Sequence, residues 1–121
     1  MLVVLLAWSA PALAAGKLHV VVTGQDHHPR VDKRWHYEVH VTNAAGKPVA
    51  SRIHLQLLFG AFPVGEVGVH VLKRGFFEET LGTPGNPPFP PAARGQHLVL
   101  RATATAKGYA QAKGSWPITV R

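Results

Sequence analysis

The 121-residue sequence contains no cysteine. A disulfide framework is therefore excluded, although small exported domains often use one, and the folded chain must be stabilised by packing alone. A lipoprotein anchor is excluded for the same reason, because that lipid is attached through a cysteine.

Side chains suited to covalent or acid–base catalysis are also scarce. Beyond residue 15 the chain has only these serines and aspartates: Ser51, Ser115, Asp26 and Asp32. It has no G-x-S-x-G motif, no phosphate-binding glycine loop and no H-E-x-x-H motif. Glu78 and Glu79 are adjacent, so on a strand they point to opposite faces and form no catalytic pair. Since an enzyme needs a nucleophile or an acid/base pair with orienting partners, we expect no enzymatic activity, no catalytic residue and no cofactor.

A long hydrophobic run is absent as well. The N-terminal apolar run covers residues 2–8, too short for a bilayer span of about 20 residues, and small residues follow it in the pattern of a secretory signal peptide. We predict cleavage after Ala14 or Ala15, which makes residues 1–15 the signal peptide. No lysine or arginine precedes the run, so a buried N-terminal segment is the alternative. The expected location is secreted, either extracellular or periplasmic, with no transmembrane segment after cleavage.

Negative charge is limited to six Asp and Glu residues against 13 Lys and Arg residues, which gives a formal net charge of +7. The positive residues are scattered, and their longest runs are the pairs at 33–34 and 73–74. A nucleic-acid-binding protein usually clusters them with stacking aromatic residues, so we expect no nucleic-acid partner. An exported basic protein better suits an anionic cell-envelope polymer or another surface protein, and simple solubility is the alternative.

Residues 16–121 are enough for one domain with a single core. Apolar residues recur there with period 2 between Gly, Pro and Asn residues, whereas no helical length shows the 3.6-residue period. The spacing of these stretches is typical of a β-sandwich. The seven predicted strands cover residues 18–23, 35–42, 52–59, 66–72, 76–81, 97–106 and 115–120.

The alternation separates an inward from an outward face on each strand. The expected core consists of Leu18, Val20, Val22, Trp35, Tyr37, Val39, Val41, Ile53, Leu55, Leu57, Phe59, Val67, Val69, Val71, Leu98, Leu100, Ala102, Ala104, Trp116, Ile118 and Val120. Histidines have the opposite phase, which predicts that they line the solvent faces: His19, His36, His40, His54, His70 and His97.

The stretch WHYEVHVT places His36, Glu38 and His40 two residues apart on one strand. His36 and His40 would then be about 13 Å apart, nearly the largest separation that two imidazoles can bridge through one ion. This strand alone therefore cannot form a compact tetrahedral site. A metal site would need His36 and Glu38 to recruit His19 from a neighbouring strand, and the alternative is an exposed polar face.

The segment 82–96 contains five prolines between residues 84 and 91. Proline favours an extended connection without ladder hydrogen bonds. We expect a stiff crossover in which Phe89 plugs the end of the sandwich. The alternative is a presented recognition loop that uses Phe89 and Arg94. The inward phase of Trp35 and Trp116 disfavours stacking of these rings on sugars.

The stretch YEVHVTNAAGKPVASRIHLQLLF, residues 37–59, resembles bacterial immunoglobulin-like (Ig-like) domains of secreted and surface proteins. The resemblance lies in the Asn-x-x-Gly-x-Pro-Val turn formed by Asn43, Gly46, Pro48 and Val49, where asparagine bonds its own backbone and glycine tolerates positive φ. Transthyretin-like and carboxypeptidase regulatory modules use similar turns.

The resemblance implies a seven-stranded Ig-like β-sandwich with a non-catalytic structural, adhesive or interaction role. Two alternative functions stay open on the residues themselves. One is an extracellular metal-binding protein that uses outward-facing histidines. The other is a module that binds an envelope polymer or glycan through its positive charge.

Overall fold

The computed structural model describes residues 16–83 and 85–121, so the predicted signal peptide lies outside the described residues. The order of elements confirms seven strands. It adds one short 3-10 helix, Pro91–Ala93, between the fifth and the sixth strand. The strands are β1 (Leu18–Gly24), β2 (Trp35–Asn43), β3 (Ser51–Phe59), β4 (Phe62–Leu72), β5 (Phe76–Leu81), β6 (His97–Thr105) and β7 (Ala112–Thr119). No helix within the described residues has the length and apolar character needed to cross a membrane.

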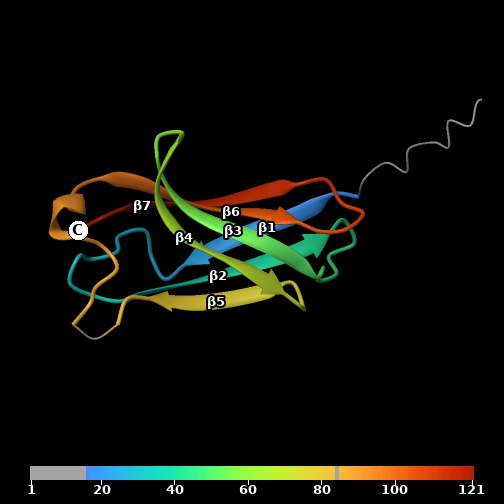
Figure 1. Cartoon of the computed structure of the whole chain (residues 1–121), viewed down its shortest axis with the longest axis horizontal. Helices are drawn as coiled ribbons and strands as arrows, with labels where there is room; N and C mark the ends of the chain where they lie inside the picture. The colour runs from blue at the N-terminus through green and yellow to red at the C-terminus, as the bar shows by residue number, and fades with distance from the viewer. Residues whose placement is uncertain (1–15, 84) are drawn as a thin grey trace, which may run out of the picture.

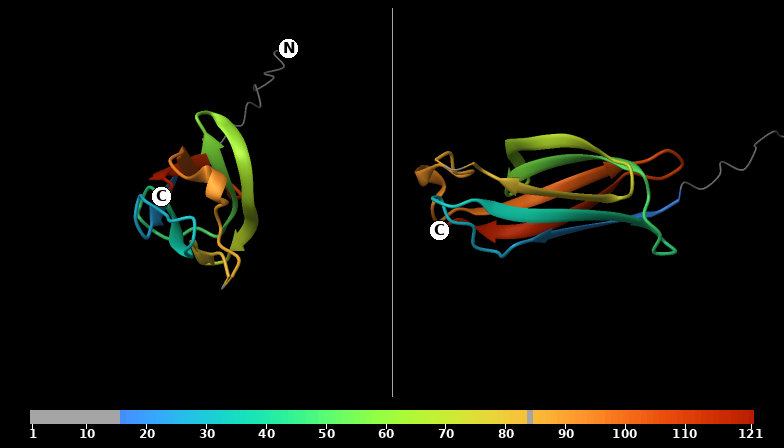
Figure 2. Two further views of the ribbon diagram at one scale, coloured as in Figure 1. Left: turned by 90° about the vertical axis from the view of Figure 1, so that its left-hand side faces the viewer. Right: turned by 90° about the horizontal axis from the view of Figure 1, so that it is seen from below.

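The strands form two antiparallel sheets that pack face to face, with the order β1-β2-β5 in one and β4-β3-β6-β7 in the other (Figure 1). The sheets approach closely along β1 and β7, where a Cβ on Gly114 would lie 2.3 Å from the carbonyl oxygen of Val20. On the other side β4 and β5 are the edge strands of their sheets (Figure 2). The fold is thus an all-β sandwich, as the alternation predicted.

The core between the sheets contains most of the predicted inward residues. Tyr37, Val39, Ile53, Leu55 and Leu100 are fully buried. Each large aliphatic side chain of this kind contributes about 1.5–3 kcal/mol through burial. The described core also contains Phe89, 2% exposed, so the proline-rich crossover does plug one end of the sandwich.

The predicted phase of β4 is wrong beyond Gly68. The β3–β4 register shifts there, because Leu55 pairs with Gly68 and Gln56 pairs with Glu66, which leaves one extra residue on β4. A one-residue bulge reverses which face each following side chain occupies. Val69 and Val71 are therefore 48% and 74% exposed instead of lying in the core.

The same bulge overturns the predicted position of His70, which points inward instead of toward solvent. Its ring stacks on Phe77, with the ring centroids 4.1 Å apart. The next inward residue, Leu72, is 1% exposed. The prediction that Phe59 lies in the core is also wrong, because its side chain is 54% exposed. A second register shift, between Leu57 and Leu58 near the hairpin tip, precedes this residue.

The turn between β2 and β3 forms as its sequence predicted. Asn43 Oδ1 accepts hydrogen bonds from the backbone N–H of Ala45 at 2.9 Å and of Lys47 at 3.0 Å. Gly46 has φ of 76°, the left-handed conformation in which glycine is favoured.

Candidate metal site

The outer face of the three-stranded sheet brings titratable side chains of β2 and β5 together. Glu38 on β2 lies directly opposite Glu78 on β5, and His36 lies opposite Thr80. Like charges that face each other across an antiparallel pair destabilise the sheet unless they are compensated. This face therefore has the electrostatic character of a cation site.

Each of the two carboxylates has a histidine beside it. His36 Nε2 is 3.6 Å from Glu78 Oε2, and His40 Nε2 is 3.4 Å from Glu38 Oε1. His36 is also oriented from its other ring nitrogen, because Nδ1 and Thr80 Oγ1 form a hydrogen bond of 3.0 Å. Such a bond is the usual way in which proteins aim the second nitrogen of a histidine at a metal.

Three of these residues have the spacing of a ligand set. His36, Glu38 and Glu78 each offer one ligand atom, and the three atoms lie within 4.8 Å of one another. In a tetrahedral zinc site with bonds of about 2.1 Å, ligand atoms are roughly 3.4 Å apart. To reach that spacing from 4.8 Å, the ligand atoms must approach one another by up to about 1.4 Å. The side chains of His36 and Glu78 are 42% and 57% exposed, so they have room to rotate by this amount.

The structure brings together only two of the three residues expected at a metal site. His36 and Glu38 are neighbours, whereas His19 pairs with Thr42, six residues further along β2 from His36. Six residues of strand span about 20 Å, so His19 cannot share an ion with His36. Glu78 takes its place. The alternation in FFEETL gives each face of the strand one Phe and one Glu, so the sequence alone did not show whether Glu78 or Glu79 points outward.

The neighbouring Glu79 points into the sandwich and belongs to a separate cluster. Glu79 Oε1 accepts a hydrogen bond of 3.0 Å from Tyr37 OH, and Glu79 Oε2 is 4.0 Å from His70 Nε2. Burial, and then the negative charge of Glu79, raise the pKa of Tyr37 well above its usual value. This cluster occupies the space between the two sheet edges β4 and β5 and does not reach the outer face.

A third polar cluster crosses the outer face of the four-stranded sheet. Glu66 accepts hydrogen bonds from Gln56 Nε2 at 2.7 Å and pairs with His54 Nε2 at 2.5 Å. Arg101 Nη2 donates to Gln56 Oε1 at 2.9 Å. The bonds from Gln56 and then His54 lower the pKa of Glu66. Since the Glu66 carboxylate is already engaged by Gln56 and His54, the cluster is better explained as a surface network of three strands than as a ligand site.

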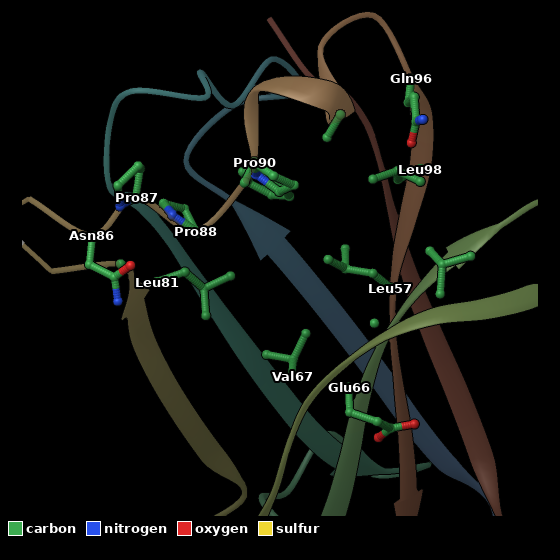
Figure 3. A pocket seen from close by; sticks show the side chains of 15 residues that line it. Leu57, Glu66, Val67, Leu81, Asn86, Pro87, Pro88, Pro90, Gln96 and Leu98 are labelled. Atoms are coloured by element: carbon green, nitrogen blue, oxygen red, sulfur yellow. The ribbon is translucent and has the colours of Figure 1, made fainter.

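A hollow lies where the proline-rich segment meets β4 (Figure 3). Its volume is about 560 Å³. The lining is mainly apolar and includes Leu57, Val67, Leu81, Pro88, Phe89 and Leu98. Neither His36 nor Glu78 lines this hollow, so it is separate from the metal candidate.

No protein-family model and no curated protein matches the sequence. Solved structures match it in fold. The CARDB domain of a Pyrococcus furiosus protein has 16% sequence identity and a TM-score of 0.56, covering 87% of this chain and 93% of that domain. A peptidase PKD domain from a Thermoplasmatales archaeon has 14% identity and a TM-score of 0.49, covering 87% and 94% of the two chains. The PmoD soluble domain from Methylocystis sp. has 15% identity and a TM-score of 0.48, covering 86% and 90%.

The similarity to the CARDB domain agrees with the Ig-like β-sandwich predicted from the sequence. At this identity it concerns the fold alone. The ligand candidates are therefore argued from the residues of this chain.

Proposed function

We propose that this chain is an exported, non-catalytic Ig-like module that binds a divalent transition-metal ion on the outer face of β2 and β5. The observation that carries the proposal is the Glu38–Glu78 pair, which places two carboxylates opposite each other with His36 alongside. The module then acts by binding, in line with its resemblance to bacterial Ig-like domains.

The ligand chemistry favours zinc or a similar ion. Imidazole nitrogen and carboxylate oxygen both bind Zn²⁺ at about 2.0–2.2 Å, and imidazole also suits Cu²⁺ and Ni²⁺. A bound dication would replace the repulsion between Glu38 and Glu78 by two attractive contacts. With three ligands from the sheet, the fourth position faces outward, where water or a partner's side chain would complete a tetrahedron.

The Pyrococcus furiosus CARDB domain was solved in complex with di-metal ions. This supports the idea that a sandwich of this architecture can carry metal. No ligand residue is transferred from that protein, because the similarity is one of fold.

Calorimetric titration of the metal-free protein with Zn²⁺ tests the proposal. The wild-type protein should bind one ion per chain. His36→Ala and Glu78→Gln each remove a ligand and should abolish the saturable signal. Thr80→Ala removes only the hydrogen bond that orients His36 and should weaken binding by about 10- to 100-fold, the usual effect of losing a group that orients a metal ligand.

His19→Ala is the matched control, because it removes an outward histidine that the structure places away from the ligand set. Its titration should equal that of the wild type. Loss of binding in His19→Ala with retention in Glu78→Gln would instead support the set expected from the sequence. A wild-type protein without saturable Zn²⁺ or Cu²⁺ binding would refute the metal-binding function.

A further inference from the structure

Three segments that are far apart in the sequence meet at one end of the sandwich, which the left view of Figure 2 faces. Backbone hydrogen bonds join them: Val31 N–H donates to Arg121 O at 2.8 Å, Arg121 N–H to Pro29 O at 2.8 Å, and Gly95 N–H to Val120 O at 2.7 Å. Segments 29–31, 94–96 and 120–121 are therefore held together. Each carries one arginine: Arg30, Arg94 and Arg121.

Two tryptophans also fix the loop that carries Arg30, through hydrogen bonds to Asp26. Trp35 Nε1 donates to Asp26 Oδ1 at 3.1 Å, and Trp116 Nε1 donates to the carbonyl oxygen of Asp26 at 2.9 Å. His27 stacks on Trp116 with ring centroids 4.0 Å apart. The backbone segments that carry the three arginines are thus bonded to one another and to the sandwich.

The three arginines line one hollow of about 440 Å³ together with Asp32. A neighbouring hollow of about 450 Å³ is lined by Lys33 and Arg34, again with Asp32. We name these five basic residues the basic end: Arg30, Lys33, Arg34, Arg94 and Arg121. Asp32 is the single acidic residue lining the two hollows, and its contact with Arg30 is long, at 3.9 Å between Oδ1 and Nε.

We infer that the basic end binds an anionic polymer whose repeating units carry phosphate or carboxylate groups. Arginine presents a planar fork of donors that matches the oxygens of both groups. Two adjacent basic hollows suit successive charges along a chain better than one small anion. Positive residues that are scattered in the sequence are collected here by the topology, which supplies a surface for the anionic envelope polymer expected from the net charge.

A nucleic acid is a less suitable ligand for this end. Single-stranded nucleic acids are usually held by aromatic side chains that stack on the bases, in addition to the positive groups. None of the described residues that line the two hollows is aromatic. The residues that line the two hollows therefore favour a polyanion that carries no nucleobases.

Retention on immobilised polymers tests this inference independently of the metal proposal, since Glu78→Gln should leave it unchanged. The phosphate probe is poly(glycerol phosphate), the carboxylate probe is polygalacturonate, and single-stranded DNA is the third arm. The variant Arg30→Gln/Arg94→Gln/Arg121→Gln should lose about tenfold or more in apparent affinity at low salt, and wild-type binding should fall steeply at high salt.

The matched control, Lys47→Gln/Lys73→Gln/Arg74→Gln, removes the same charge at the opposite end, in the β2–β3 and β4–β5 turns. It should lose less than about twofold. Equal losses in both triple variants would indicate diffuse attraction by net charge and overturn the inference. So would a wild type that binds neither polymer at low salt, or one that binds DNA more tightly than both. Preference for one of the two polymers identifies whether phosphate or carboxylate is the recognised group.

Discussion

Glu38 on β2 and Glu78 on β5 lie directly opposite each other, and each has an imidazole nitrogen within 3.6 Å of a carboxylate oxygen. The two strands are joined by a long excursion through β3 and β4, so this pair exists only because β2 and β5 become neighbours in the sheet. Like charges that face each other across an antiparallel pair disfavour the pairing of the two strands. A bound cation converts the same arrangement into a stabilising one.

Removing one of these carboxylates should therefore have opposite effects with and without metal. In metal-free protein, Glu78→Gln should leave the free energy of unfolding unchanged or raise it by up to about 0.5 kcal/mol, because repulsion is removed. With Zn²⁺ at about 100 times its Kd, the wild type should gain about 2.7 kcal/mol and the variant nothing. Urea unfolding in chelator and in Zn²⁺ measures both quantities.

Glu66→Gln is the control for that experiment, since it removes an exposed carboxylate from the other sheet. Its gain from Zn²⁺ should equal that of the wild type. If Glu66→Gln lost the gain and Glu78→Gln kept it, the metal would be bound by the His54–Glu66 pair instead.

The alternation of the core can be tested together with its reversal on β4. Leu55→Ala, at a fully buried position, should cost about 2–5 kcal/mol of unfolding free energy. Val71→Ala should cost less than about 0.5 kcal/mol, because that side chain is 74% exposed. Chemical denaturation compares the two directly. A large loss for Val71→Ala would restore the regular phase that the sequence alone favoured.

Most of the fold could be predicted from the sequence because one face of every strand packs against the core. The period-2 pattern then identifies strands and inward residues together, as for Tyr37, Ile53 and Leu100. The bulge on β4 could not be recognised in this way. The letters VGVHV continue the alternation through Gly68, yet the extra residue at the bulge reverses the faces that Val69 and His70 occupy.

Two of the three residues of the candidate site were predictable for a similar reason. His36 and Glu38 share a face through local spacing, which the sequence contains. Glu78 joins them through the register between β2 and β5, a contact between segments 40 residues apart that no local pattern encodes. The basic end escaped prediction in the same way, since Arg30, Arg94 and Arg121 come from three distant segments.

Tyr37 should make stability depend on alkaline pH. The pKa of Tyr37 is raised in the folded state, mainly by burial. Its contribution to the free energy of unfolding is therefore fully present below the ordinary tyrosine pKa near 10. As pH rises above that value, the unfolded chain loses the proton first, and the free energy of unfolding should fall by up to about 1.4 kcal/mol per pH unit.

Tyr37→Phe should flatten this alkaline loss, although it costs about 1 kcal/mol at neutral pH through the missing bond to Glu79. Tyr109→Phe is the control and should keep the steep wild-type slope. Denaturant unfolding of the three metal-free proteins above and below pH 10 supplies the comparison. Parallel slopes for wild type and Tyr37→Phe would rule out Tyr37 as the group responsible.

The N-terminal segment should be removed during export. Expression of the full sequence in a secreting bacterium should yield a mature protein that begins at Ala15 or Gly16, because the predicted cleavage follows Ala14 or Ala15. Intact-mass measurement of the exported fraction identifies the first residue. Replacement of Leu5 and Leu6 by Arg interrupts the apolar run and should keep the protein inside the cell. A protein exported at full length, or equally well with both arginines, would favour a buried N-terminal segment.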